Sequence, residues 1–129
     1  KRILSALERE NAPVIVFETE SVDGGKLIEG EKFVYDFTFR NEGKSPLKLT
    51  NAKASCGCTT PFWPKGEEIA PGETGKVTVS FNSKGRIGNQ AKSVTVRSND
   101  PDAATKILKF KVLVVKDPFH AGSIMGGSN

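Results

Sequence analysis

The sequence predicts an all-β fold, an immunoglobulin-like antiparallel β-sandwich of about seven strands with Greek-key connections. Short runs in which apolar and polar residues alternate are separated by Gly, Pro, Asn and Asp, and helical periodicity is absent after Pro13. The chain of 129 residues has the length of one domain. We expect a tether or short helix over residues 1–12, the sandwich over 13–116 and a mobile tail over 117–129.

The clearest strand lies at 33–39, where the aromatic residues Phe33, Tyr35, Phe37 and Phe39 fall on one face. Further strands are expected at 14–18, 47–55 and 75–82, around Val94 and Val96, and at 105–116. The apolar face of these strands predicts the shared core: Phe33, Phe37, Phe39, Val79, Phe81, Val96 and Phe110.

The segment from Lys84 to Asn89 contains two glycines, as phosphate-binding loops do. A phosphate loop needs a strand before it and a helix after it, whereas strands are expected on both sides of this segment. The sequence therefore predicts a hairpin turn here.

The formal net charge is +4 and the pI about 9.1. The lysines of the predicted strands stand singly, as Lys92, Lys106, Lys109 and Lys111 do, which favours a solvated outer sheet face over a nucleic-acid surface. No apolar run approaches the roughly 20 residues of a membrane helix. The chain starts at Lys1 and not at Met, which fits a processed N-terminus and an exported protein.

Several short motifs recur in one known family: FRNEG from Phe39, PL from Pro46, SCGCTT from Ser55, PGE from Pro71, KGR from Lys84, and SN from Ser98. With these motifs the chain resembles an uncharacterised bacterial domain of unknown function with an SCGCT signature, related in fold to ASH and major-sperm-protein domains. The resemblance implies a β-sandwich, commonly behind a signal peptide or lipoprotein leader in Bacteroidetes-like bacteria. It implies a periplasmic or envelope location, a possible upstream lipid anchor and no known activity.

Cys56 and Cys58 are the only cysteines, separated by Gly57. Residues i and i+2 of a strand have Cα atoms near 6.5 Å apart, so a disulfide needs a kink that glycine permits. The chain-entropy model gives this small ring only roughly 1.6 kcal/mol. Three interpretations stay open: structural cysteines, a soft-metal site for Cu(I), and a thiol-redox pair. Zinc would need two further ligands, and the one histidine, His120, lies in the predicted tail as a solvated side chain.

The aromatic pair Phe62 and Trp63 lies between two prolines directly after the cysteines. Such rings form either a binding edge for a peptide or glycan or a plug at the end of the sandwich. We predict that the segment from Cys56 to Pro64 is a loop in which Phe62 or Trp63 is partly exposed and belongs to an interaction surface.

The chain offers no recognisable catalytic constellation, because a single histidine in a tail supports no Ser/His/Asp arrangement and Glu67 and Glu68 fall in a turn. We expect no enzyme activity and no cofactor. The sequence predicts a noncatalytic binding or scaffolding module of the bacterial cell envelope with a protein or glycan partner. The alternative is a copper-binding or thiol-redox protein centred on Cys56 and Cys58.

Overall fold

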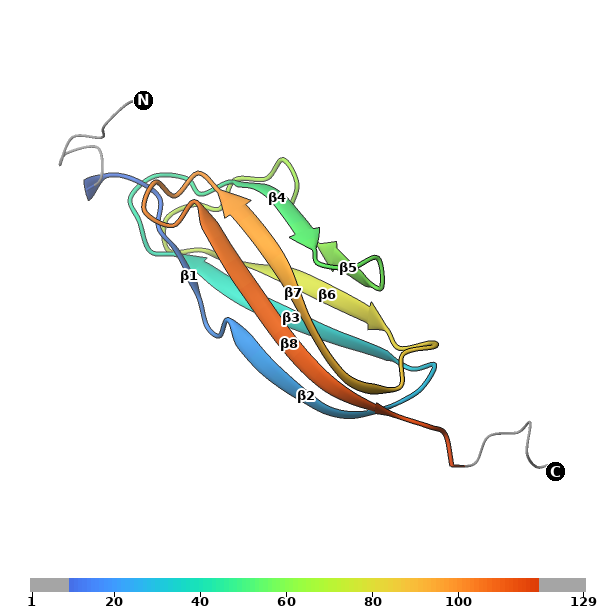
Figure 1. The fold of residues 1–129 in the computed structure, drawn as a ribbon. Coiled ribbons are helices and arrows are strands. Elements are labelled where there is room, and N and C mark those ends of the chain that lie inside the picture. Colours follow the sequence, from blue (N-terminus) through green and yellow to red (C-terminus); the bar gives the residue numbers. More distant parts are fainter. Residues whose placement is uncertain (1–9, 119–129) are drawn as a thin grey trace.

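The computed structural model describes residues 10–118, which form two packed four-stranded sheets (Figure 1). Sheet A has the strand order β1-β3-β6-β5, and sheet B has the order β2-β8-β7-β4. The strands are β1 (Ile15–Phe17), β2 (Ser21–Ile28), β3 (Lys32–Asn41), β4 (Leu49–Ala54), β5 (Thr59–Phe62), β6 (Thr74–Asn82), β7 (Gly88–Ser98) and β8 (Thr105–Val115). The predicted immunoglobulin-like sandwich is confirmed.

The strand inventory differs from the prediction in two ways. The structure has eight strands, and β2 runs parallel to β8, whereas every other pairing is antiparallel. The parallel pair arises because the chain leaves β1 in sheet A and enters sheet B as β2 beside β8. The sequence did not reveal β2, since a bulge between Asp23 and Lys26 breaks its alternation at two glycines.

The core lies between the sheets and is built from the inward faces of the alternating strands. Six of the seven predicted core residues are buried; Phe33 is the exception, being half-buried and packed against the core beside Phe110. Phe37, Phe39 and Phe81 are completely buried, and each contributes about 1.5–3 kcal/mol through apolar burial. Phe33 lies on β3, as Phe37 and Phe39 do, but near the first residue of the strand, which explains its partial exposure.

Two connections differ from the sequence interpretation. The glycine-containing segment after β6 is not a hairpin turn, because it joins β6 in sheet A to β7 in sheet B. The segment from Cys56 to Pro64 is not a continuous loop, because Thr59–Phe62 pair with β6 as strand β5. Pro61 is accommodated there because β5 is an edge strand.

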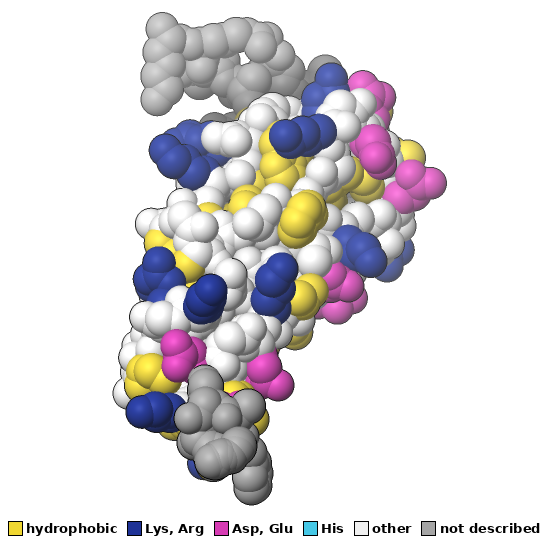
Figure 2. Space-filling model, turned by 90° about the vertical axis from the view of Figure 1, so that its right-hand side faces the viewer, with side chains coloured by type: hydrophobic (Ala, Val, Ile, Leu, Met, Phe, Trp, Pro, Cys, Tyr) yellow, Lys and Arg dark blue, Asp and Glu magenta, His cyan; other side chains and the backbone are white. Residues whose placement is uncertain are grey.

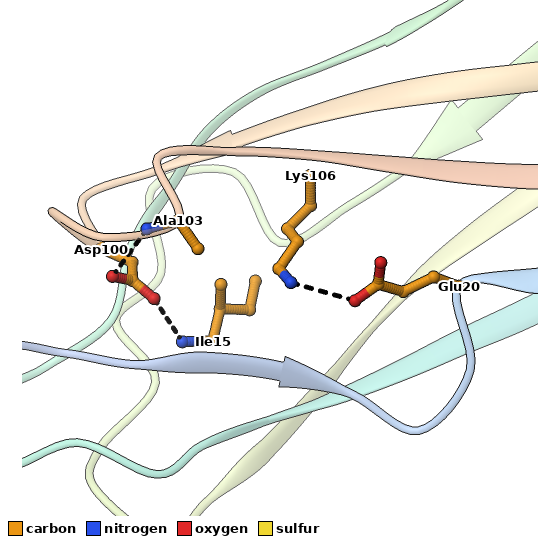
Figure 3. A network of polar contacts seen from close by, with 5 residues as sticks. All are labelled: Ile15, Glu20, Asp100, Ala103 and Lys106. Carbon is orange, nitrogen blue, oxygen red and sulfur yellow. Dashed lines mark hydrogen bonds and ion pairs between the residues drawn. The ribbon is translucent and has the colours of Figure 1, made fainter.

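The short strand β1 is fixed by two buried polar side chains. Asn41 donates through Nδ2 to the carbonyls of Ser45 and Ile69, at 2.8 Å each, and accepts at Oδ1 from the N–H of Val14 and of Gly43. The second side chain is Asp100, whose carboxylate accepts a hydrogen bond from the backbone N–H of Ile15 (Figure 3). These hydrogen bonds give partners to buried polar groups, which would destabilise the fold if they were left without them.

The described residues contain no helix long and apolar enough to cross a membrane. Residues 1–9 and 119–129 lie outside the described part of the chain. Most of the predicted N-terminal tether and most of the predicted tail, with His120, therefore fall outside it.

Candidate functional site

Strand β5 places Phe62 on the outer face of sheet A. β5 pairs only with β6, so it forms one edge of that sheet. Phe62 lies opposite Thr78, which lies opposite Asp36 on β3, so the three residues form a row across the sheet. Phe62 is 58% exposed, the largest of the exposed hydrophobic side chains in the described chain. A ring of this size on a rigid strand offers apolar surface at low entropic cost.

A hollow of about 390 Å³ lies beside Phe62, between the segment after β5 and the outer face of β6. Its lining includes Phe62, Trp63, Pro64, Glu67, Lys76 and Thr78. The hollow combines apolar rings with one acidic and one basic side chain, a composition suited to an amphipathic ligand.

Trp63 has a different environment from Phe62. It is half-buried and packs against the hydrophobic core, and the Lys65 ammonium group lies 5.5 Å from its ring centroid. Trp63 is thus the more enclosed of the two rings, while its neighbour Phe62 is the exposed one. The role of either ring in binding stays a prediction.

One side of the described part of the molecule shows no continuous apolar region. Figure 2 shows the side of the molecule that faces right in Figure 1, and its hydrophobic side chains form small separate patches among Lys, Arg, Asp and Glu. A binding site on this side would therefore rest on a few separate apolar side chains and not on one broad apolar surface.

Asp36 contributes the site's one perturbed carboxyl group. Its Oδ1 accepts a hydrogen bond from the Thr78 hydroxyl at 2.6 Å, and its Oδ2 lies 3.5 Å from the Lys76 ammonium group. The hydrogen bond from Thr78, together with the positive charge of Lys76, lowers the pKa of Asp36 below the ordinary value of an aspartate. The carboxylate therefore stays charged beside the hollow at neutral pH.

Cys56 and Cys58 form a disulfide in the turn that joins β4 of sheet B to β5 of sheet A. Their Cα atoms are 5.3 Å apart, closer than in a regular strand, because the turn kinks at exposed Gly57. The Cys58 N–H donates to Cys56 Sγ at 3.2 Å, and the Thr59 N–H donates to the Cys56 carbonyl at 3.3 Å. Both cysteines are half-buried, so the bond is neither in the core nor fully exposed.

The disulfide bears on the copper alternative. The bond occupies both sulfur atoms, so Cu(I) binding would require the reduced pair. Within residues 10–118, no group of three or more His, Cys, Asp or Glu side chains is arranged to hold a metal ion. The metal and redox roles of the pair stay predictions.

The sequence pointed to Phe62, Trp63 and the cysteines but missed their neighbours on other strands. Lys76 and Thr78 of β6 line the hollow, and Asp36 of β3 lies opposite Thr78. Only the registers of β3 with β6 and of β6 with β5 bring these residues near Phe62. Nothing in the local sequence of these residues signals that proximity.

Comparison with solved structures supports the fold. A protein of unknown function from Porphyromonas gingivalis W83 matches with a TM-score of 0.70 and 23% identity, over 84% of this chain and 50% of that one. The chain thus spans about half the length of that protein. The ASH/PapD-like domain 7 of human CEP192 matches with a TM-score of 0.60 and 13% identity, over 93% of this chain and 96% of that one. The predicted fold relationship to ASH domains is confirmed.

Enzymes also contain domains of this shape. The secreted serine protease VesC from Vibrio cholerae matches with a TM-score of 0.55 and 13% identity, over 84% of this chain but only 24% of that one. At such identities the likeness concerns the fold alone. No curated protein matches the chain significantly in sequence. The family described as a protein of unknown function (DUF1573) matches residues 15–114, and this chain belongs to that family.

Proposed function

We propose that this chain is a noncatalytic binding module of the bacterial cell envelope that holds a protein or glycan partner at the hollow beside Phe62. The observation that carries the proposal is the 58% exposure of Phe62 on an ordered edge strand, next to a hollow of about 390 Å³. An exposed aromatic ring held by a sheet is the kind of residue that dominates binding energy at interfaces.

The surroundings of Phe62 suit a recognition role. Trp63, which lines the hollow, is packed against the core, and Glu67 and Lys76 can bond polar groups of a partner. A pre-formed site of this kind loses little entropy when it binds. A peptide side chain or the apolar face of a sugar would both satisfy these groups.

An envelope location is supported by the Cys56–Cys58 disulfide. Disulfides persist in oxidising compartments such as the periplasm and are rare in the cytosol. Fractionation of cells that express the full-length gene tests this part of the proposal. A membrane-impermeant maleimide applied after mild reduction should label the two cysteines in cells with a permeabilised outer membrane; labelling only after complete lysis would contradict an envelope location.

The binding proposal is tested by photo-crosslinking from position 62 in living cells. Val34 provides a matched control, because it lies on the same outer face of sheet A and is also 58% exposed. We expect a crosslinked partner from position 62 but not from position 34, and loss of the purified partner's affinity in Phe62→Ser. Equal crosslinking from both positions, or unchanged affinity in the variant, would refute the site.

A second candidate function, thiol–disulfide exchange, is favoured by one observation: the half-exposed disulfide closes a turn of only three residues. Such a small ring gains little stability from chain entropy, which leaves the bond open to attack by an external thiolate. The test is equilibration with glutathione buffers of known potential. A bond that stays oxidised at the most reducing ratio would exclude exchange with cellular thiols.

A further inference from the structure

The outer face of sheet B gathers basic side chains that are separate along the sequence. On β7 and β8 the even-numbered residues from Val94 to Val96 and from Leu108 to Val114 are buried, so the odd-numbered side chains point outward. The outward set includes Lys109 and Lys111 on β8 and Arg97 on β7. Lys53 on β4 faces outward too, since its neighbour Ala52 is buried.

The register places small hydroxyl side chains beside these lysines. Lys109 lies opposite Ser21 of β2 on one side and Ser93 of β7 on the other. Ser55 continues the row, because its Oγ accepts the Ser93 N–H at 3.1 Å. Lys111 lies in the next row, between Asp23 and Ala91.

Two adjacent hollows of about 420 and 440 Å³ occupy this face. Both are lined by Ala91 and Lys111, so they form one shallow depression that crosses β2, β8 and β7. The hollow of about 420 Å³ contains Ser21, Ser55, Ser93 and Lys109 in its lining, and none of its described lining residues is acidic.

The Lys109 ammonium group has no ion-pair or hydrogen-bond partner among the described residues. Lys111 has only a long contact, 3.9 Å to Asp23, between two largely exposed side chains. By contrast, Lys106 is already held by Glu20 at 3.0 Å and does not belong to this surface (Figure 3). The unpaired Lys109 ammonium group beside serine hydroxyls, with the weakly paired Lys111 in the next row, offers a site for an anionic group.

We propose that this face binds an acidic polysaccharide, with carboxylate or sulfate groups on Lys109 and Lys111 and sugar hydroxyls on the flanking serines. Charge complementarity favours this occupant, since Lys53 and Arg97 extend the positive charge along the face while Asp23 is the one acidic side chain beside the depression. A repeating anion matches such a row of cations better than a single ion does.

The same face disfavours two other ligands. The inner strands β7 and β8 use their backbone groups in ladders on both sides, so a peptide cannot add as a strand over this surface. The outward residues of the described strands β7 and β8 include no aromatic ring on which a neutral sugar could stack. The negative charge of the polysaccharide is therefore the expected basis of recognition.

The test titrates the folded protein with polygalacturonate oligomers and with heparin, at low and at physiological salt. We expect binding that weakens as salt rises, and an affinity about tenfold lower in the double variant Lys109→Ser/Lys111→Ser. A matched variant, Lys32→Ser/Lys84→Ser, removes the same charge from exposed positions outside sheet B and should retain the affinity. Phe62→Ser should also retain it, which separates this site from the proposed partner site.

Three results would overturn the proposal. The first is an absence of binding to both polyanions at low salt. The second is an equal loss in the two double variants, which would show unspecific attraction to the net charge. The third is lysine-dependent binding to vesicles containing phosphatidylglycerol without binding to either polysaccharide, which would assign the face to a membrane surface.

Discussion

Asp100 Oδ2 accepts a hydrogen bond of 2.9 Å from the backbone N–H of Ile15, a residue 85 positions earlier in the chain (Figure 3). The other oxygen, Oδ1, accepts from the N–H groups of Asp102 and Ala103 in the turn between β7 and β8. Asp100 is 2% exposed. One buried carboxyl group therefore shapes a turn of sheet B and holds β1 of sheet A to it.

Replacing this carboxyl group should destabilise the sandwich. Asp100→Asn turns one acceptor oxygen into an NH2 donor that faces backbone N–H groups, so we expect the free energy of unfolding to fall by about 1–3 kcal/mol. Urea denaturation measures it. Glu42→Gln, an exposed carboxyl-to-amide change, is the control and should have almost no effect. Equal stability of the two variants would contradict the role of Asp100.

The completely buried Asn41 should be comparably sensitive. Asn41→Asp removes the two donations to the Ser45 and Ile69 carbonyls and sets a carboxyl oxygen against them. We expect a loss of about 2 kcal/mol or more at neutral pH. Thermal unfolding compares Asn41→Asp with Asn89→Asp, the same change at an exposed position. A melting temperature of Asn41→Asp no lower than that of Asn89→Asp would refute this role of Asn41.

Gly24 tests the packing under the β2 bulge. A Cβ atom at this position would lie 2.5 Å from a Phe33 ring carbon and 2.6 Å from a Val112 methyl carbon. Gly24→Ala should therefore cost about 1–3 kcal/mol through overpacking. Calorimetry measures the stability of this variant. Gly57→Ala is the matched control and should cost little, because a Cβ added there meets no atom within 4 Å.

The depressed pKa of Asp36 gives a pH-dependent prediction. A carboxyl group with a lowered folded-state pKa stabilises the fold above its unfolded pKa, and this contribution disappears as the pH falls through the folded value. Thr78→Val removes the hydrogen bond that is the largest cause of the lowered pKa, so the pKa of Asp36 should rise. Carboxyl-carbon NMR titration measures it, and Ser80→Ala, two residues along the same strand, should leave it unchanged.

The disulfide should matter little to folding. The double variant Cys56→Ser/Cys58→Ser is expected to lose less than about 2 kcal/mol, because the closed ring is so short. Chemical denaturation of the variant and of the reduced wild-type protein measures this loss. Failure of both to fold would assign the pair a structural role, whereas tight one-to-one copper binding by the reduced protein would favour the soft-metal alternative.

The sequence determined six of the eight strands, all but β2 and β5, and which of their faces is buried. The alternation from Phe33 to Phe39 and from Leu108 to Val114 encodes an apolar face, because successive side chains of a strand point to opposite sides. It also singled out the pair Phe62 and Trp63, of which the structure leaves Phe62 exposed. These properties depend on residues close together in the chain, so the local pattern carries them.

Only the tertiary structure decided which strands pair, and pairing decides the surfaces. The sequence presented Lys109 and Lys111 as scattered charges and Thr59–Phe62 as a loop. Sheet B sets Lys109 between serines of two other strands with Lys111 in the next row, and sheet A takes up β5 as an edge strand. The Asp100–Ile15 bond likewise exists only after both sheets have packed. Such contacts join residues distant in sequence, and no local periodicity specifies their register.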